Sequence, residues 1–155
     1  ISCSLVGSEM CIRDRNNADI RIVSGGTTSQ IVARELGVEV KSSTEIYDKE
    51  VPPIAYIQGV DLVTEGVLTL SKTIDRLKSL SKSLDSDIFK AKDGASQMAK
   101  LLYSASHIKL LVGRSLNIAN AESSFQRDLE LRLHVVGELE KILVKLGKIV
   151  TVEYY

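Results

Sequence analysis

The sequence lacks both a charge excess and a long apolar run. Its 155 residues include 20 Lys and Arg against 20 Asp and Glu, so the formal net charge is zero. Nucleic-acid-binding domains usually carry a basic excess, and no block of Lys or Arg occurs here. No apolar stretch approaches the roughly 20 residues that span a bilayer. We therefore expect a soluble domain with neither nucleic acid nor membrane among its partners.

Cysteine is confined to the start of the chain. Cys3 and Cys11 are the only two, and both lie in residues 1–15, which read ISCSLVGSEMCIRDR. This stretch does not begin with Met, is too polar for a secretory signal, and resembles a translated sequencing adapter. We expect a non-native leader over 1–15 and a single α/β domain over 16–155. Without cysteine, that domain is expected to hold no disulfide and no thiolate-bound metal, which is compatible with the cytoplasm.

Strand-like and helix-like patterns alternate from residue 16 onward, and tryptophan is absent, so the core is expected to consist of Leu, Ile, Val and Ala. The pattern predicts strands at Ile20–Val23, Val38–Val40, Ile54–Ile57, Val60–Val63, His107–Val112 and Ile149–Tyr154. It predicts helices over Ser29–Leu36, over a segment with Val67, Leu70, Ile74 and Leu77 on one face, from the N-cap Asp93 to Leu102, and over Leu129–Leu146. Gly37 and Gly147 are the predicted C-terminal caps of the first and the last of these helices. Residues 79–87 read as a solvated loop. The alternation predicts an α/β fold, a three-layer, mostly parallel, Rossmann-like sheet with helices on both faces.

A glycine-rich turn joins the first predicted strand to the helix that follows. It reads Ser24-Gly25-Gly26-Thr27-Thr28. Paired glycines let the backbone approach a ligand closely, and the free N–H groups of a first helical turn attract anions. The turn matches neither the Walker loop nor the G-x-G-x-x-G fingerprint. Two interpretations stay open, a phosphate pocket and a plain structural turn with an N-cap.

Three predicted strand ends carry polar or glycine-rich sequence. Ligands of open parallel sheets bind outside the carboxyl ends of the strands, so these ends are expected to form one binding rim. The candidate ligand-binding residues are Gly25, Gly26, Thr27, Thr28, Asp61, Thr64, Glu65, Arg114 and Asn117. In the plainer interpretation, Asp61 and Glu65 are exposed carboxylates at strand ends. Arg114 and Asn117 are then ordinary loop residues. No catalytic residue can be named, and two distant histidines, His107 and His134, make no zinc site.

Several blocks of the sequence carry a family resemblance. They are SGGTTSQIVARELGVEV, EVPPIAYIQGVDLVTEGVLTLSKTIDRLK, LLVGRSLNIAN and the closing GKIVTVEYY. Together they resemble the C-terminal region of bacterial proteins similar to stage II sporulation protein E, which are PPM-type, metal-dependent serine/threonine phosphatases. The resemblance covers roughly residues 19–155. Where the family pattern commonly reads VG-T-x-x-N, this chain has Arg114 after Gly113 but keeps Asn117.

The resemblance implies that the catalytic chemistry lies outside this chain. In such proteins a preceding phosphatase domain supplies the aspartates that hold two Mn²⁺ or Mg²⁺ ions, and this chain lacks those metal motifs. No cofactor is therefore expected in this fragment, and the phosphatase domain of the parent chain is an expected partner. The adapter-like leader also implies that a first strand of the α/β domain is missing.

Three functions follow as hypotheses. The first is a non-catalytic accessory domain of such a phosphatase, which binds a small anionic ligand at the strand ends and regulates the parent. The second is a structural or homodimerisation module that uses the Leu129–Leu146 helix as its partner face. The third is a stand-alone enzyme acting on a phosphorylated substrate, with Asp61 or Glu65 as base.

Overall fold

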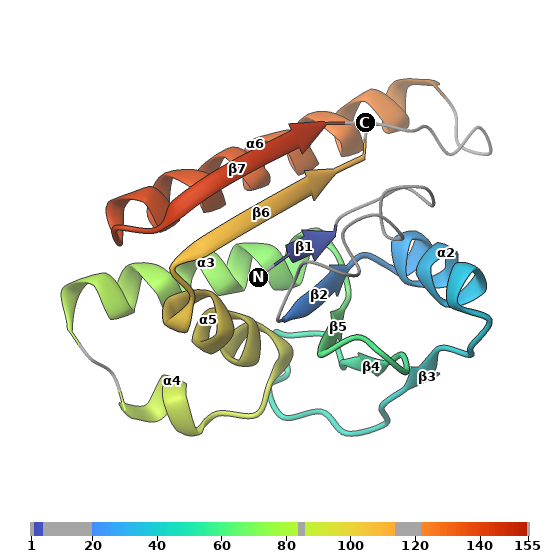
Figure 1. The fold of residues 1–155 in the computed structure, drawn as a ribbon, viewed down its shortest axis with the longest axis horizontal. Coiled ribbons are helices and arrows are strands. Elements are labelled where there is room, and N and C mark those ends of the chain that lie inside the picture. Colours follow the sequence, from blue (N-terminus) through green and yellow to red (C-terminus); the bar gives the residue numbers. More distant parts are fainter. Residues whose placement is uncertain (1, 5–19, 84–85, 114–121, 155) are drawn as a thin grey trace.

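A seven-stranded sheet runs through the centre of the molecule (Figure 1). The computed structural model describes residues 2–4, 20–83, 86–113 and 122–154. The strand order is β3-β4-β5-β2-β1-β6-β7. Strands β5, β2, β1, β6 and β7 are parallel, whereas β4 runs antiparallel to β5 and β3 antiparallel to β4. The bounds are β1 Ser2–Ser4, β2 Arg21–Ser24, β3 Lys41–Ser42, β4 Ala55–Tyr56, β5 Leu62–Thr64, β6 His107–Val112 and β7 Ile149–Tyr154.

The start of the chain supplies a central strand. Strand β1 lies between β2 and β6, with Cys3 opposite Ile22 on one side and Leu110 on the other. The expectation that the α/β domain consists of residues 16–155 alone is therefore wrong for Ser2–Ser4. The physical reason is that the inner edges of β2 and β6 need backbone partners, which any short extended segment can provide. The adapter origin of the leader and the absence of a native first strand stay predictions.

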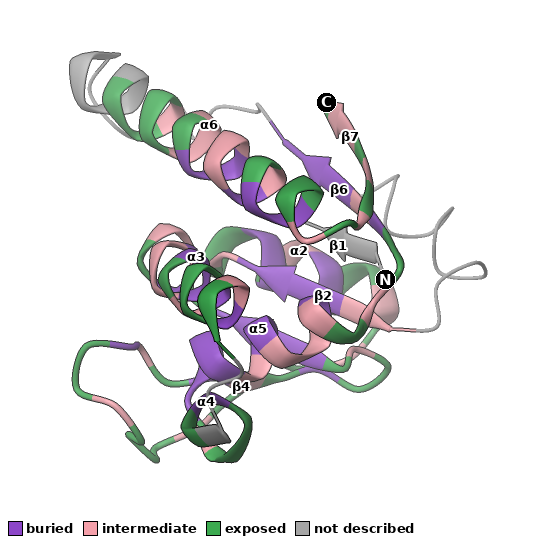
Figure 2. Ribbon diagram, turned by 90° about the vertical axis from the view of Figure 1, so that its left-hand side faces the viewer, coloured by how far each residue is buried: buried purple, intermediate pink, exposed green. Residues whose placement is uncertain are grey.

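Helices cover both faces of the sheet, as predicted for a three-layer α/β fold. Their bounds are α2 Gly26–Leu36, α3 Val67–Lys82, α4 Ser86–Lys90, α5 Gly94–Ser104 and α6 Glu122–Lys145. Helices α3, α5 and α6 pack on one face and enclose a main core of Ile22, Ile54, Leu62, Leu70, Ile74, Leu77, Met98, Ala99, Leu102, Ile108, Leu110, Val112, Val135, Val136, Leu139, Ile142 and Leu143. Helix α2 covers the other face over a smaller core of Val23, Val32, Ala33, Ile57 and Val63. Figure 2 shows the buried residues on β2, on β6 and along one side of α6.

The helix caps follow the sequence closely. Gly37 and Gly147 both have positive φ, at 65° and 81°, and each ends its helix where a C-terminal cap was predicted. Asp93 caps α5, because its Oδ1 accepts a hydrogen bond from the Ser96 N–H at 2.9 Å. Local chemistry alone thus sets three of the helix ends.

Two sequence predictions of local structure are wrong. Helix α3 continues through Ser79 to Lys82 into the predicted loop, because Leu80 extends the apolar face of the helix and is buried. Residues 38–40 form no strand, and pairing begins instead at Lys41. The side chains of Val38 and Val40 pack against the smaller core, so burial accounts for their apolar character.

Candidate functional site

The glycine-rich turn after β2 is hydrogen-bonded to the end of β5. Gly25 has φ 121° and ψ 135°, a conformation open to glycine but strained for other residues. Its N–H donates to the Thr64 carbonyl oxygen at 3.0 Å, and its own carbonyl accepts from the Ser29 N–H at 2.9 Å. Since Ser24 is in register with Thr64, the two parallel strands end at the same level. The turn is therefore held at the carboxyl edge of the sheet.

Helix α3 begins beside the same turn. Its N-cap is Gly66, and a Cβ added to Gly66 would lie 3.7 Å from the Gly25 Cα. Neither α2 nor α3 has a side-chain capping hydrogen bond or an acidic residue in its first turn. Two helix N-termini thus lie side by side with no acidic residue inside either first turn to offset their partial positive charge, and Glu65 immediately precedes the N-cap of α3. We call this place the rim, formed by Gly25, Gly26, Thr27, Glu65 and Gly66.

Only some of the predicted hydroxyl groups reach the surface of the rim. Gly26 and Thr27 are exposed, whereas Thr28 and Thr64 are buried. The Thr64 Oγ1 lies 3.2 Å from the Ser24 Oγ, which donates in turn to the Glu65 carbonyl oxygen at 3.0 Å. The Thr64 hydroxyl therefore joins the ends of β2 and β5, and the ligand-binding role predicted for Thr28 and Thr64 does not fit their burial.

The two predicted carboxylates lie at opposite edges of the sheet. Glu65 follows β5 and is exposed at the rim, as expected. Asp61 precedes β5, and its Oδ2 accepts a hydrogen bond from the Arg21 N–H at 2.7 Å, at the start of β2. Asp61 therefore belongs to the amino edge, and its assignment to the rim is wrong. It satisfies a backbone donor where the β2 and β5 ladder begins.

The third strand end predicted to contribute to the rim, which carries Arg114 and Asn117, is not part of the site that the structure describes. Arg114 and Asn117 lie outside the described residues. Strand β6 ends at Val112, and β1 separates it from β2 in the strand order. The site that the structure describes is therefore confined to the ends of β2 and β5.

An ion-pair network missed by sequence reasoning supports α3 and α5 behind the rim. The Arg76 Nη2 lies 3.0 Å from Asp48 Oδ2 and 3.2 Å from Asp93 Oδ1, and the Arg76 Nε donates to Ser96 Oγ at 2.7 Å. The network ties α3 to the cap of α5 and to the loop before Val51. Only long-range packing could reveal it.

Gly66 lies in one of the three strand ends that the sequence indicates, but it is not among the predicted ligand-binding residues. The local signal was available, because a strand, a glycine and a helix follow one another at Gly66 as they do at Gly25. The apposition of the two glycines depends on the parallel pairing of β2 with β5, which no local pattern specifies.

The described residues contain no group of three or more His, Cys, Asp or Glu side chains placed to hold a metal ion. Within the same part of the chain, no helix combines the length and the apolar character needed to cross a membrane. His107 and His134 are both exposed, the first on β6 and the second on α6.

The fold and the rim define an α/β domain with a candidate anion site at the carboxyl edge of its sheet. Comparisons of the chain with models of known protein families, with curated proteins and with solved structures give no significant match.

The two glycines of the turn are expected to respond in opposite ways to alanine. Gly25→Ala should lower the free energy of unfolding by about 1–3 kcal/mol, because an L residue is strained at this φ. Gly26→Ala should raise it by about 0.4–1 kcal/mol, since no atom lies within 4 Å of the added Cβ and Gly26 is not at positive φ. Chemical denaturation of both variants measures the difference, and equal effects would contradict the described turn.

Proposed function

We propose that this chain is a non-catalytic α/β domain that binds a small anionic ligand at the rim. The observation that carries the proposal is the close approach of Gly66 to Gly25, where a Cβ added to Gly66 would lie 3.7 Å from the Gly25 Cα, so that the N-termini of α2 and α3 lie together. Each N-terminus presents backbone N–H groups and a partial positive charge, and no side chain caps either of them. A phosphate or carboxylate group placed between them would accept hydrogen bonds from both helices.

Thr27 and Glu65 give the rim its selectivity in this proposal. The Thr27 hydroxyl is exposed beside the N-terminus of α2 and can donate to an anion oxygen. The exposed carboxylate of Glu65 repels a second negative group but accepts hydrogen bonds from hydroxyls. A ligand with one anionic group and neighbouring hydroxyls, such as a phosphorylated sugar or a nucleotide, satisfies both residues.

We also propose that the domain is the C-terminal accessory part of a cytoplasmic, PPM-type phosphatase similar to stage II sporulation protein E. The sequence blocks quoted above support this parentage. Under this proposal Mn²⁺ or Mg²⁺ is held by the phosphatase domain of the parent chain, and the ligand at the rim regulates that domain. An uninterrupted reading frame upstream of residue 16 tests it. Metal-binding aspartates in that frame are the expected result, and their absence would remove the link.

Thr27→Glu is expected to separate binding from stability. A carboxylate in the first turn of α2 interacts favourably with the helix dipole. The free energy of unfolding of Thr27→Glu should therefore exceed that of the wild type by about 0.3–1 kcal/mol. The same carboxylate occupies the rim and repels an anion. The ligand at 100 times its Kd should stabilise the wild-type protein by about 2.7 kcal/mol and the variant hardly at all. Thermal unfolding with inorganic phosphate, nucleotides and sugar phosphates measures both effects.

Thr27→Gln is the matched control, because glutamine has nearly the same shape as glutamate but carries no charge. It should keep most of the ligand-induced stabilisation. If no anion stabilises the wild-type protein, or if Thr27→Glu and Thr27→Gln respond alike, the rim is not an anion site.

A further inference from the structure

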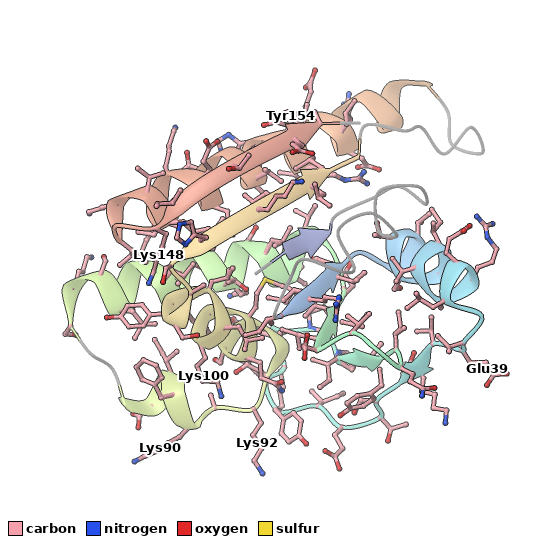
Figure 3. The ribbon with its side chains drawn as sticks, viewed as in Figure 1. Glu39, Lys90, Lys92, Lys100, Lys148 and Tyr154 are labelled. Atoms are coloured by element: carbon pink, nitrogen blue, oxygen red, sulfur yellow. The ribbon has the colours of Figure 1, made fainter. Side chains whose placement is uncertain are left out.

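Four lysines lie on or against helices α4 and α5. Lys90 is the last residue of α4, Lys92 follows it, Lys100 lies on α5, and Lys148 comes directly before β7. All four are labelled in Figure 3, where Lys90 and Lys92 extend away from the ribbon. Among the residues that the structure describes, none of the four forms an ion pair with a carboxylate. This part of the surface therefore carries positive charge that the described side chains do not neutralise.

Two of these lysines are held in fixed positions by main-chain carbonyl groups. The Lys100 Nζ donates to the carbonyl oxygens of Phe89 at 3.3 Å and Ala91 at 3.0 Å, at the end of α4. The Lys148 Nζ donates to the Tyr103 carbonyl oxygen and lies 5.3 Å from the centre of the Tyr103 ring. An ammonium group has three donors, so each lysine keeps at least one for another acceptor. Because both amines are already ordered, a ligand there would immobilise little additional side chain.

An aromatic pair lies between the two ordered amines. The rings of Phe89 and Tyr103 are in edge-to-face contact, with their centres 5.9 Å apart and their planes at 75°. Lys100 is bound to the backbone of Phe89, and Lys148 to that of Tyr103. Phe89 is 40% exposed and Tyr103 is half-buried. We call this part of the molecule the aromatic–lysine surface, formed by Phe89, Lys90, Lys92, Lys100, Tyr103 and Lys148.

We propose that the aromatic–lysine surface binds an acidic segment of a partner protein, in which one apolar side chain lies between carboxylates. The apolar side chain packs on the exposed part of the Phe89 ring, and the carboxylates accept hydrogen bonds from the lysines around it. A central aromatic anchor with complementary charges around it is typical of protein interfaces. Helices α4 and α5 contain one acidic residue, Asp87, in the first turn of α4, so lysines dominate the charge of this surface.

A short protein segment fits this surface better than a membrane or a nucleic acid does. Phe89 is the one large apolar side chain of α4 and α5 that is strongly exposed. It can anchor a single residue, but it does not make the continuous apolar face with which a helix enters the bilayer interface. A nucleic acid would extend beyond the four lysines, and the chain as a whole has no basic excess to bind it.

Fluorescence anisotropy of a labelled peptide tests the proposal on the full 155-residue chain. The peptide carries two glutamates on each side of a central leucine. Lys90→Glu should weaken its binding about fivefold or more, because an ammonium group that attracts the peptide becomes a carboxylate that repels it. Lys41→Glu is the matched control. Lys41 is also exposed and its replacement changes the net charge equally, but it lies on β3, far from α4 and α5 (Figure 1). This control should bind the peptide as the wild type does.

A second peptide, with glycine in place of the leucine, tests the role of Phe89 without changing the protein. It keeps every charge and should bind about threefold or more weakly, because no side chain packs on the ring. Equal affinity for the two peptides would overturn the proposed anchor. The absence of saturable binding at about millimolar peptide, or equal weakening by Lys90→Glu and Lys41→Glu, would overturn the site.

Vesicles of phosphatidylcholine and phosphatidylserine and a single-stranded DNA oligonucleotide test the other two classes of partner. If either displaces the leucine peptide and loses its own affinity in Lys90→Glu, the surface serves that class and the proposal is wrong. Thr27→Glu, which adds a carboxylate at the rim, should leave the affinity for the peptide unchanged. Anion binding at the rim and peptide binding at the aromatic–lysine surface can therefore each fail without the other.

Discussion

Replacing Arg76 with methionine should lower the free energy of unfolding by about 3–5 kcal/mol. The Asp93 side chain is only 6% exposed and the Arg76 side chain 17%. Removal of the guanidinium would leave a buried carboxylate without its charge partner, and this loss costs far more than the loss of a surface ion pair. Methionine keeps most of the side-chain volume, so the effect reports on charge and hydrogen bonding. Equilibrium denaturation in urea measures it.

The matched control for Arg76 lies one helical turn earlier. Lys72 forms an ion pair with Glu50 at 2.6 Å, and the hydrogen bond to Glu50 raises the pKa of Lys72 above its usual value. Because this pair is open to solvent, Lys72→Met should leave stability close to that of the wild type. If Lys72→Met and Arg76→Met destabilise the protein equally, the network at Asp93 is not a buried one.

Leu139→Ala should lower the free energy of unfolding by about 2–5 kcal/mol. Leu139 is fully buried in the main core, on the side of α6 that faces the sheet and α3. Truncation removes apolar contacts and leaves a cavity that the surrounding helices fill only in part. Thermal or chemical unfolding measures the loss.

The same variant tests the hypothesis that the leucines of α6 form a partner face. Their stripe packs inside the protein, so the oligomeric state of Leu139→Ala should equal that of the wild type at a concentration where both are folded. Leu131, 51% exposed on the same helix, provides the control, and Leu131→Ala should change stability by less than about 0.5 kcal/mol. A folded Leu139→Ala that loses dimerisation would restore α6 as the interface.

The sequence predicts most of the elements whose signals are local. Strands β6 and β7 have the predicted bounds, and the caps at Gly37, Asp93 and Gly147 lie where their chemistry places them. These features depend on neighbouring residues, on periodicity, and on the glycine or carboxylate that a helix end needs. The α/β class follows from their alternation.

Most features of the candidate site that the sequence did not predict depend on strand pairing. Asp61 and Glu65 are four residues apart, and only the bounds of β5 separate them into opposite edges of the sheet. The insertion of β1 between β2 and β6 is likewise a property of the sheet as a whole. The burial of Thr64 and the close approach of Gly66 to Gly25 follow from the register between β2 and β5. Pairing of distant segments leaves little trace in a short window of sequence.

The most direct test of the central claim is a titration of the protein with inorganic phosphate, followed through its backbone amide resonances. The two-helix rim predicts saturable shifts at Gly26 and Thr27 of α2 together with Val67 and Leu68 of α3. All of these shifts should follow one binding curve, and Thr27→Glu should abolish them. The absence of any saturable shift at the rim would contradict the account. So would shifts confined to exposed lysines such as Lys90 and Lys92.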